Sequence, residues 1–446
     1  RSEGFYRRLI IIRFEKSVPK SQRDPNLAEK LAAELCYKPE EAWKVLDDAA
    51  IRQADDYCER YKAFLDRAKT EREAVAEAIR QAEEAGFVPF DRHKPLKAGD
   101  KVYYSNRGKA LLLAVIGAKP IAEGVSIAAA HIDSPRLDLK PNPLYEDHNL
   151  AYLDTHYYGG VKKYQWVTIP LAIHGVIVKK DGTCVEINIG ENEDDPVFFV
   201  SDLLIHLAQE QLEKKAAKVI EGEALDIIVG NKPLLIDKKD KKKDEKEAGK
   251  EAVKAGVLDI LKETYDIHEE DFVSAELEIV PAGKAREAGF DRSMILAYGQ
   301  DDRVCAYTSM QAMLDSDVTD RTMCCILVDK EEIGSVGATG MQSHFFENAV
   351  AEVMNLTGEY SELHVRRCLA HSCMLSSDVS SAFDPTYASS FDKKNVAYLG
   401  GGMVINKFTG ARGKSGSNDA NAEYLAHLRH IFDTIMTDDE KGKELC

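Results

Sequence analysis

Short apolar runs, several of which end in polar and chemically reactive residues, are the feature that most constrains the fold of this chain. Leu111–Ile116 and Val125–Ala130 are two such runs. Two more follow at Met323–Asp329 and Cys368–Leu375, with helical patterns between them. Strands that alternate with helices are typical of a mostly parallel sheet covered by helices. We therefore predict an α/β fold with a helix-covered, mostly parallel central sheet.

The length of the chain, 446 residues, exceeds what one hydrophobic core usually organises. Apolar and polar residues alternate through residues 166–189, and Asp181-Gly182 between two such runs predicts a β-hairpin. The simplest organisation is an α/β domain in two parts, residues 1–140 and 291–446, interrupted by a β-rich insertion, residues 141–290.

Local patterns predict the main helices. Residues 27–85 carry apolar and small residues at steps of three and four. Within them, Thr70 with Glu73 resembles a capping box before a helix that Gly86 ends. Residues 198–218 predict a further amphipathic helix.

Composition excludes several classes of partner. The chain has 59 Lys and Arg against 76 Asp and Glu, a formal net charge of −17, so we expect no nucleic-acid or anionic-membrane surface. Residues 237–254 mix charges of both signs with almost no apolar residue, which indicates a solvated loop. No apolar run approaches the roughly 20 residues of a transmembrane helix.

The expected location of the protein is the cytoplasm. Arg7-Arg8 precede an apolar stretch, Leu9–Ile12, that is too short for a signal peptide. Nine cysteines without a repeated spacing favour reduced thiols over a disulfide framework.

Histidine and carboxylate residues form four clusters, each after an apolar, strand-like run. The clusters are His131/Asp133, Asp301/Asp302, Glu331/Glu332 and Asp378. Ligand sites in open α/β sheets gather at the carboxyl ends of strands. Imidazole and carboxylate together suit two divalent first-row ions, zinc above all, with cobalt or manganese as substitutes.

Neighbouring residues within a cluster can take different chemical roles. The side chains of Glu331 and Glu332 diverge, so one carboxylate can bind metal while the other faces a water as general base. His131 and Asp133 point the same way on a strand, and a carboxylate there can orient the imidazole ring.

Each cluster alone also has an ordinary interpretation. His131 with Asp133 is compatible with a polar strand end, and Asp301-Asp302 with an acidic helix N-terminus. Glu331-Glu332 is compatible with an acidic surface turn. Their co-occurrence favours a two-metal hydrolase, which needs a bridging carboxylate, further ligands and a base.

Four motifs surround these clusters. They are Ala130-His131-Ile132-Asp133-Ser134-Pro135-Arg136, Tyr298-Gly299-Gln300-Asp301-Asp302-Arg303-Val304, Asp329-Lys330-Glu331-Glu332-Ile333-Gly334-Ser335 and Ser377-Asp378-Val379. Together they resemble the aspartyl aminopeptidase family, especially its bacterial branch, over about residues 50 to 430. The resemblance implies a two-metal α/β catalytic domain, an inserted dimerisation domain matching residues 141–290, and dimers assembled into a dodecamer.

The resemblance also implies a metal-ligand set. His131 would bind one ion, Asp301 would bridge both ions, Glu332 would be a terminal ligand, and Asp378 would bind on the other side.

Other matched residues take supporting roles in the same resemblance. Glu331 would be the general base, and Asp133 would act with it beside His131. Asp302 would lie just behind the ligands. The family's basic residue for acidic substrates is matched by Lys407, with Arg412 further on.

The chain departs from the family at its end. The family continues past the stretch resembling Ser415–Glu423 to a Met-His pair whose histidine is the last metal ligand, and this chain ends first. His427 and His430 fall in an expected helix and are interpreted as ordinary histidines, so the second metal would lack one ligand. The charged tail, Thr437–Cys446, is unlike the family, which truncation or a shifted reading frame would explain.

These features predict a two-metal aminopeptidase that removes single N-terminal residues from peptides. The family name favours N-terminal Asp or Glu, and a broader preference stays open. Two alternatives remain open as well: a related two-metal N-acyl amino acid deacylase, and a non-catalytic oligomeric scaffold that has lost its last metal ligand.

Overall fold

The computed structural model describes residues 24, 26, 29–31, 35–36, 41–234, 251–317, 319–408 and 419–437. The chain forms two compact units. The smaller unit contains the chain up to Ile51 together with Ser381–Ala420, and the larger contains Arg52–Ser380 and the chain from Asn421. The stretch Arg7–Ile12, most of the loop predicted at 237–254, Arg412 and the tail beyond Thr437 lie outside the described residues.

A mixed six-stranded sheet organises part of the larger unit. In spatial order its strands are β1 (Val88–Pro89), β2 (Lys101–Asn106), β3 (Ala110–Val115), β14 (Met323–Val328), β4 (Ser126–His131) and β15 (Cys373–Ser376). Among these described strands, three neighbouring pairs are parallel and two are antiparallel. The α/β class is as predicted, whereas the sheet is mixed.

The antiparallel part of this sheet comes from a tight hairpin between β2 and β3. The N–H of Lys109 donates to the carbonyl of Asn106 at 3.0 Å. The two residues between them, Arg107 and Gly108, have φ of 59° and 66°. Two successive positive φ values give the turn a twist that matches antiparallel strands. The sequence offers no Asn-Gly or Asp-Gly pair here, so the pattern did not reveal the turn.

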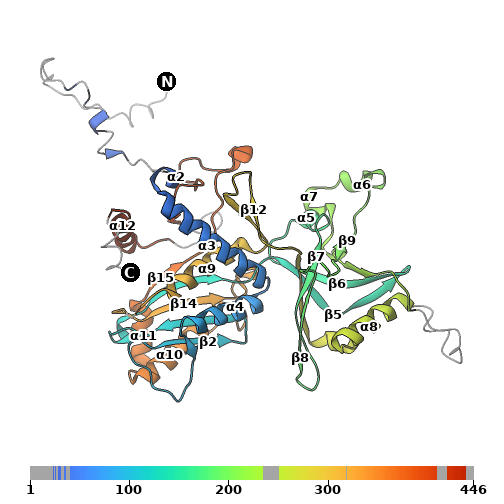
Figure 1. Ribbon diagram of the computed structural model, residues 1–446, viewed down its shortest axis with the longest axis horizontal. Helices are drawn as coiled ribbons and strands as arrows, with labels where there is room; N and C mark the ends of the chain where they lie inside the picture. Colours follow the sequence, from blue (N-terminus) through green and yellow to red (C-terminus); the bar gives the residue numbers. More distant parts are fainter. Residues whose placement is uncertain are drawn as a thin grey trace, which may run out of the picture. The chain divides into compact units, whose positions relative to one another are not determined.

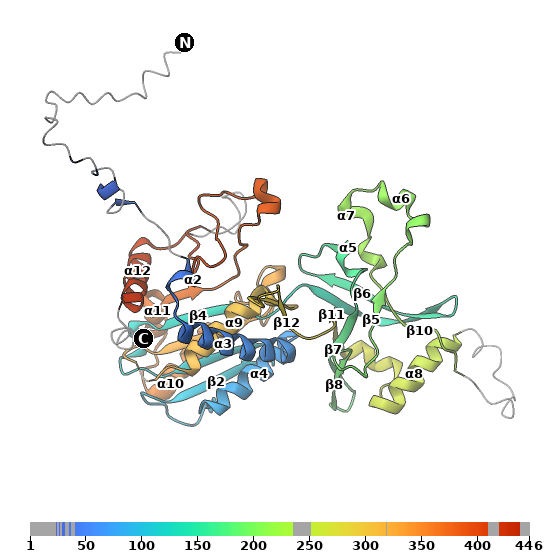
Figure 2. The same ribbon diagram turned by 45° about the horizontal axis from the view of Figure 1, so that its top comes forward.

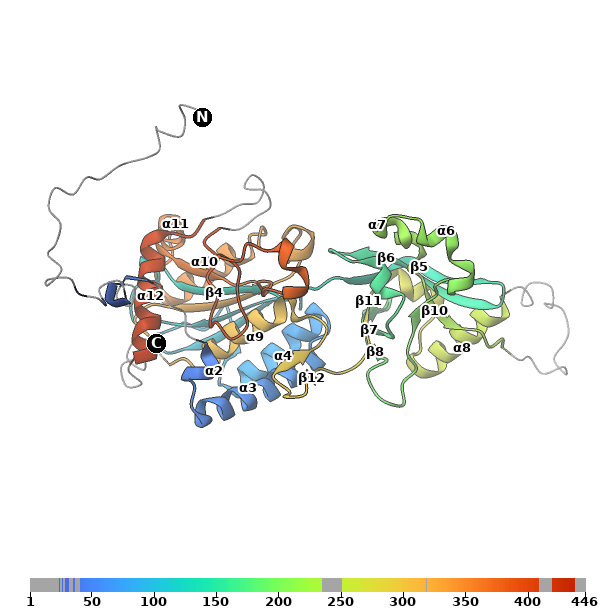
Figure 3. The same ribbon diagram turned by 90° about the horizontal axis from the view of Figure 1, so that it is seen from above.

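Helices cover both faces of the six-stranded sheet. On one face lie α3 (Asp48–Arg67), α4 (Glu71–Glu84) and α9 (Gln300–Leu314), and on the other α10 (Phe345–Thr357) and α11 (Glu362–His371). Figure 1 and Figure 3 show the strands between these two groups of helices. Along β3, Leu111 and Leu113 join the first core, and Leu112 joins the second, because side chains alternate on a strand.

The start and end predicted for the helix between Thr70 and Gly86 are confirmed. Thr70 accepts the N–H of Glu73, and the Glu73 side chain accepts the N–H of Thr70, which completes a capping box at α4. The helix ends at Glu84, and Gly86 has a φ of 87°.

The strand predicted over Cys368–Leu375 is wrong in its first half. The Ser361 side chain accepts the N–H of His364 and caps α11, which continues to His371. Cys368 is buried on this helix, in the core beneath the sheet. Apolar residues near a helix end and those of the next short strand form one run in the sequence, which periodicity does not divide.

A seven-stranded sheet lies in the middle of the sequence. Its spatial order is β8 (Cys184–Ile189), β7 (Leu171–Val178), β11 (Ala275–Pro281), β5 (Arg136–Asp147), β6 (Leu150–Tyr158), β10 (Ile227–Gly230) and β9 (Phe199–Val200). β7 and β8 form the antiparallel hairpin predicted around Asp181-Gly182. The helix α8 (Ala252–Tyr265) contributes to the core of this sheet, as Figure 2 shows. The predicted boundaries of the insertion and its role in dimerisation stay predictions.

The amphipathic helix predicted over residues 198–218 is wrong. The segment contains β9, a 3-10 turn at Ile205–Leu207 and two single-turn α-helices, α6 (Gln209–Leu212) and α7 (Ala216–Val219). Neither has a capping side chain, and Leu203–Ile205 remain exposed. Helices in proteins gain most of their stability from burying one face, and this segment buries too little to form a long helix.

The remaining described α-helices and strands lie outside these two sheets. They are α2 (Ala42–Val45), α5 (Lys163–Trp166), α12 (Ala422–Thr437) and the two-stranded sheet of β12 (Arg286–Ala288) and β13 (Met294–Leu296). No helix among the described residues has the length and apolar content needed to cross a bilayer.

Candidate metal centre

The four predicted clusters come together in the larger unit, at one end of the six-stranded sheet. β4 ends at His131, β14 ends three residues before Glu331, and β15 ends two residues before Asp378. Because β4 lies between β14 and β15 and runs parallel to both, their carboxyl ends are adjacent. The start of α9 adds Asp301 and Asp302.

His131 has both ring nitrogens engaged and only 3% of its surface exposed. Nδ1 lies 3.0 Å from the carbonyl oxygen of Asp133, and Nε2 lies 3.1 Å from Oδ1 of Asp301. Burial alone would lower the pKa of His131, but hydrogen bonds to Asp133 and Asp301 raise it to about 11. An Nδ1–H that donates to Asp133 leaves the Nε2 lone pair for a metal ion.

Asp133 is fully buried and holds the turn that carries the two glutamates. Its Oδ1 accepts the main-chain N–H of Glu331 at 3.1 Å, and its Oδ2 accepts that of Glu332 at 3.2 Å. Oδ2 also accepts the hydroxyl of Tyr158 at 2.6 Å. Burial would raise the pKa of Asp133, but hydrogen bonds with His131 and Tyr158 lower it, so the carboxylate stays ionised.

The main chain of Asp301 is also held from behind. Its carbonyl accepts the hydroxyl of Ser134 at 2.7 Å. The buried guanidinium of Arg303 donates to the same Ser134 oxygen at 2.7 Å and to the carbonyl of Lys69 at 2.9 Å. The carboxylate of Asp301 is therefore directed towards His131 by a rigid main chain.

Two triplets of side chains bring possible ligand atoms within 4.8 Å of one another. One is His131, Asp301 and Glu332, and the other is His131, Asp302 and Asp378. Asp302, predicted to lie behind the ligands, thus approaches His131 as closely as a ligand would. Both of its carboxylate oxygens are buried, and neither accepts a conventional hydrogen bond from a described residue. The thiol of Cys305, a weak donor, lies near them.

Crowding of negative charge marks this cluster. Burial raises the pKa values of Asp302 and Glu332, each to about 7, with nearby carboxylates adding to the effect. Burial likewise raises the pKa values of Glu331 and Asp378. Divalent cations would offset this repulsion, and one imidazole with several carboxylates is a donor set that zinc, cobalt and manganese accept. The residues present fit the predicted ions.

The other predicted residues lie on other elements. Lys407 is exposed in the smaller unit, with its Nζ 5.6 Å from the ring centre of Phe408, and its role stays a prediction. His427 and His430 lie on α12, the helix expected there.

Tyr158 is the residue that sequence reasoning missed. It ends β6 in an alternating strand pattern, where an aromatic residue is ordinary, and nothing in that pattern indicates a contact with Asp133.

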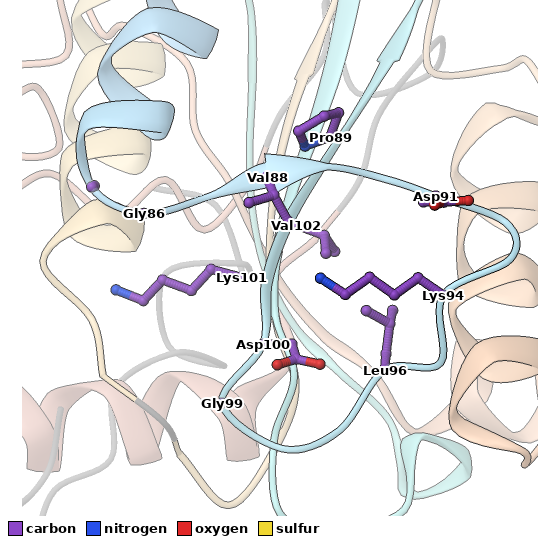
Figure 4. Close-up of a pocket in the computed structure, with 11 residues that line it drawn as sticks. Gly86, Val88, Pro89, Asp91, Lys94, Leu96, Gly99, Asp100, Lys101 and Val102 are labelled. Carbon is purple, nitrogen blue, oxygen red and sulfur yellow. The ribbon is translucent and has the colours of Figure 1, made fainter.

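A pocket of about 300 Å³ opens elsewhere in the larger unit, between the end of α4 and strands β1 and β2 (Figure 4). Lys94, Asp100 and Lys101 are among its lining residues. No predicted site residue lines it, so this pocket is separate from the metal centre.

Comparison with known families identifies the family of this chain. The family described as "Aminopeptidase I zinc metalloprotease (M18)" matches residues 64–436. The chain belongs to the M18 aminopeptidases. The resemblance drawn from the four motifs is thereby confirmed.

Individual M18 relatives cover most of the chain. The probable M18 family aminopeptidase 1 of Clostridium acetobutylicum is 59% identical over 395 residues, which are 88% of this chain and 83% of the relative. A solved M18 aminopeptidase from Thermotoga maritima superposes with a TM-score of 0.81 at 42% identity, covering 89% of this chain and 84% of that one. Aminopeptidase I from C. acetobutylicum gives a TM-score of 0.78 at 56% identity, covering 89% and 85%.

A more distant structure shares the fold alone. The mApe1 dodecamer of Saccharomyces cerevisiae superposes with a TM-score of 0.61 at 19% identity, covering 78% of this chain and 76% of that one.

The M18 chain described here is a zinc-dependent aminopeptidase, as its family and close relatives show. Of the three functions left open by the sequence, the family supports the aminopeptidase over the N-acyl deacylase and the non-catalytic scaffold.

Proposed function

We propose that the enzyme releases single N-terminal residues from peptides at the His131 cluster, using two divalent ions and Glu331 as general base. The observation that carries the proposal is the convergence of two ligand triplets on His131, next to a glutamate that belongs to neither. In this assignment His131, Asp301, Glu332 and Asp378 hold the ions, with Asp301 between them. Zinc is the expected metal, and cobalt or manganese would substitute.

The ions, when bound, polarise the scissile carbonyl and lower the pKa of the attacking water. The protein's own groups handle the proton. Oε2 of Glu331 lies 3.9 Å from Nε2 of His131, so its carboxylate faces the space where ions and substrate would meet. It takes the proton from water as the carbonyl is attacked and returns it to the leaving amine.

Exposure of the cluster's outer members suits entry of a substrate. The side chain of Asp301 is 54% exposed and that of Glu331 is 47% exposed, whereas His131 and Asp133 are buried behind them. A free α-amino group would bind among these carboxylates, which favours substrates with an unblocked N-terminus.

Preference for N-terminal Asp or Glu is proposed from the family resemblance, with Lys407 as the residue that binds the acidic side chain. A Lys407→Met variant should then lose selectivity for Asp over Leu substrates while its rate on Leu substrates stays the same.

Assembly and location are also proposed from the family resemblance and from the cysteines. The insertion at residues 141–290 would pair subunits into dimers that build a larger homo-oligomer, and the yeast relative mApe1 is itself a dodecamer. The described cysteines form no disulfide, which supports a reducing compartment such as the cytoplasm.

The test is hydrolysis of Asp, Glu, Leu, Met and Lys p-nitroanilides by protein stripped of metal and resupplied with zinc, cobalt or manganese. We expect metal-dependent release, strongest on a subset of the panel. Silence with every metal, from folded protein, would contradict the proposed reaction.

Glu331→Gln tests the base separately. It should abolish turnover while zinc content stays at the wild-type level, because it removes a proton acceptor and leaves the ligands in place. Glu362→Gln, on the exposed face of α11, is the matched control and should keep full activity. Retained turnover in Glu331→Gln would remove Glu331 from this role.

A further inference from the structure

Tyr158 joins the seven-stranded sheet to the metal centre. It is the last residue of β6, lies opposite Arg136 of β5 in the antiparallel ladder, and is 6% exposed. Its hydroxyl donates to Oδ2 of Asp133 at 2.6 Å, the length of a strong bond to a charged acceptor. A residue from the second sheet therefore contacts the carboxylate on which the turn of Glu331 and Glu332 depends.

Two cations lie over the ring of Tyr158. The guanidinium carbon of Arg136 lies 4.0 Å from the ring centre, and Nζ of Lys330 lies 5.2 Å from it. Arg136 is itself fixed by Asp138 at 2.8 Å and by Glu278 at 3.2 Å. A cation over an aromatic face is attracted to it, and more strongly when the pair is buried. The phenol therefore presents its hydroxyl to Asp133 in one orientation.

The next residue packs directly against the same turn. Gly159 has a φ of 75°, and a Cβ atom there would lie 3.2 Å from both Cβ and Oε2 of Glu332. The Tyr158-Gly159 segment thus contacts the turn at two points: through Asp133 and against the Glu332 side chain.

Asp133 has a fixed orientation only while all of its partners are present. Its Oδ1 faces the N–H of Glu331 and lies 3.3 Å from Nδ1 of His131. Its Oδ2 accepts both the Tyr158 hydroxyl and the N–H of Glu332. Rotation about the terminal torsion of an aspartate is soft, so loss of the shortest of these bonds lets the carboxylate turn. The main chain of Glu331 then loses its fixed anchor.

We propose that Tyr158 is a positioning residue for the reaction, acting through Asp133 to hold the carboxylate of Glu331 where it transfers the proton. The inference rests on the proposed function of Glu331. It assigns to the seven-stranded sheet a part in catalysis, in addition to any part in assembly.

The test is Tyr158→Phe, which removes the hydroxyl and keeps the ring next to both cations. We expect kcat to fall roughly 10- to 100-fold, because small displacements of a reacting group have effects of that size. KM, zinc content and melting temperature should stay close to those of the wild type. Tyr145→Phe is the matched control. Tyr145 lies on β5, next to β6, and its hydroxyl donates to Asp226 at 2.8 Å, so its loss should leave kcat unchanged.

A double-mutant cycle separates positioning from general loss of structure. Asp133→Asn keeps the shape of the side chain and weakens the same contacts. Combined with Tyr158→Phe, it should reduce kcat no further than the larger single effect, because both act along one path. Effects that multiply would overturn the proposal, and the cycle can be read even where one variant is less stable.

The inference and the proposed function fail differently. Normal kcat in Tyr158→Phe, with Glu331→Gln inactive, overturns the inference alone. A Tyr158→Phe variant whose zinc content or melting temperature falls together with kcat also overturns the inference, because the role of Tyr158 is then only structural. An active Glu331→Gln overturns the proposed function and the inference with it.

Discussion

Two groups of buried charge in the larger unit differ in how their negative charges are balanced. The first, here called the Arg136 cluster, consists of Arg136, Glu71, Glu278, Asp138 and Lys109. The second is the His131 cluster of the metal centre. Both contain carboxylates removed from water, and Tyr158 lies between Arg136 and Asp133.

The Arg136 cluster contains its own cations. Arg136 lies 3.4 Å from Glu71 and 3.2 Å from Glu278, and Lys109 lies 3.4 Å from the other oxygen of Glu71. Burial would raise the pKa of Glu71, but Arg136 and other neighbours lower it. Burial and the charge of Glu71 raise the pKa of Glu278, so Glu278 holds a proton more readily than Glu71 does.

The His131 cluster has one imidazole beside six acidic side chains. Burial raises the pKa values of four of them, Asp302, Glu331, Glu332 and Asp378. The presence or absence of balancing cations distinguishes a structural charge cluster from a ligand site. Where the protein supplies the opposite charge, the cluster supports the fold, and where it does not, the missing charge is the ligand's.

Removing a carboxylate should therefore have opposite effects on stability in the presence and absence of metal. Asp301→Asn should lose bound zinc and about a thousandfold in kcat/KM, since bound ions contribute several kcal/mol to the transition state. In chelator, Glu332→Gln should melt at a higher temperature than the wild type, because burial and neighbouring carboxylates disfavour the charge that it removes.

Asp317→Asn, an exposed residue beyond α9, is the control for this change and should alter neither property. If metal-free Glu332→Gln melts below the wild type, the two clusters do not differ in charge balance as described.

Arg136→Met should weaken the fold more than it affects metal binding. It leaves Glu71 and Glu278 buried without their shared cation, and breaking a buried ion pair typically costs about 3–5 kcal/mol of unfolding free energy. Urea unfolding at neutral pH measures the loss. Arg366→Met, on the exposed face of α11, should change stability by less than about 0.5 kcal/mol. A loss below about 1 kcal/mol in Arg136→Met would show that the cluster is not structural.

The pH dependence of the metal-free protein should have an unusual sign. Asp302 and Glu332 have pKa values of about 7 in the folded chain, above their ordinary values near 4. The folded chain then binds more protons than the unfolded chain between about pH 4 and 7, so stability falls as pH rises through this window.

Thermal unfolding in chelator at pH 5, 6 and 7 tests this sign. The melting temperature should decrease along the series, and added zinc should raise it most at pH 7. Glu332→Gln should reduce the slope. A melting temperature that rises from pH 5 to pH 7 in chelator would refute the assignment of excess negative charge.

Gly159→Ala should have the smallest effect. Its Cβ would meet Glu332 at 3.2 Å in a backbone conformation that glycine favours, with an expected cost of about 1–2 kcal/mol and a few-fold loss of kcat. Gly160→Ala is the control, since no atom lies within 4 Å of the added Cβ. If the two changes affect kcat equally, the contact between Gly159 and Glu332 does not influence the reaction.

The sequence predicted what depends on local patterns. Apolar runs located β3, β4 and β14, and the polar residues at their ends identified the clusters, because strand ends in a parallel arrangement must be adjacent. The capping box of Thr70 and Glu73 is likewise a local signal, and the structure contains it.

What the sequence did not predict depends on distant contacts. The hydrogen bond of Tyr158 with Asp133 joins two sheets, and the approach of Asp302 to His131 depends on how the start of α9 meets β4. The helix wrongly predicted over residues 198–218 fails for a related reason: periodicity describes a face but not whether anything covers it.

The turn of Glu331 and Glu332 is anchored through its main chain, and this makes the two positions unusually open to redesign. Asp133 binds N–H groups that every residue except proline possesses. Replacing the side chains at 331 and 332 therefore leaves the anchor intact. A library of substitutions at these two positions should yield folded proteins that share one scaffold and differ in the chemistry they perform.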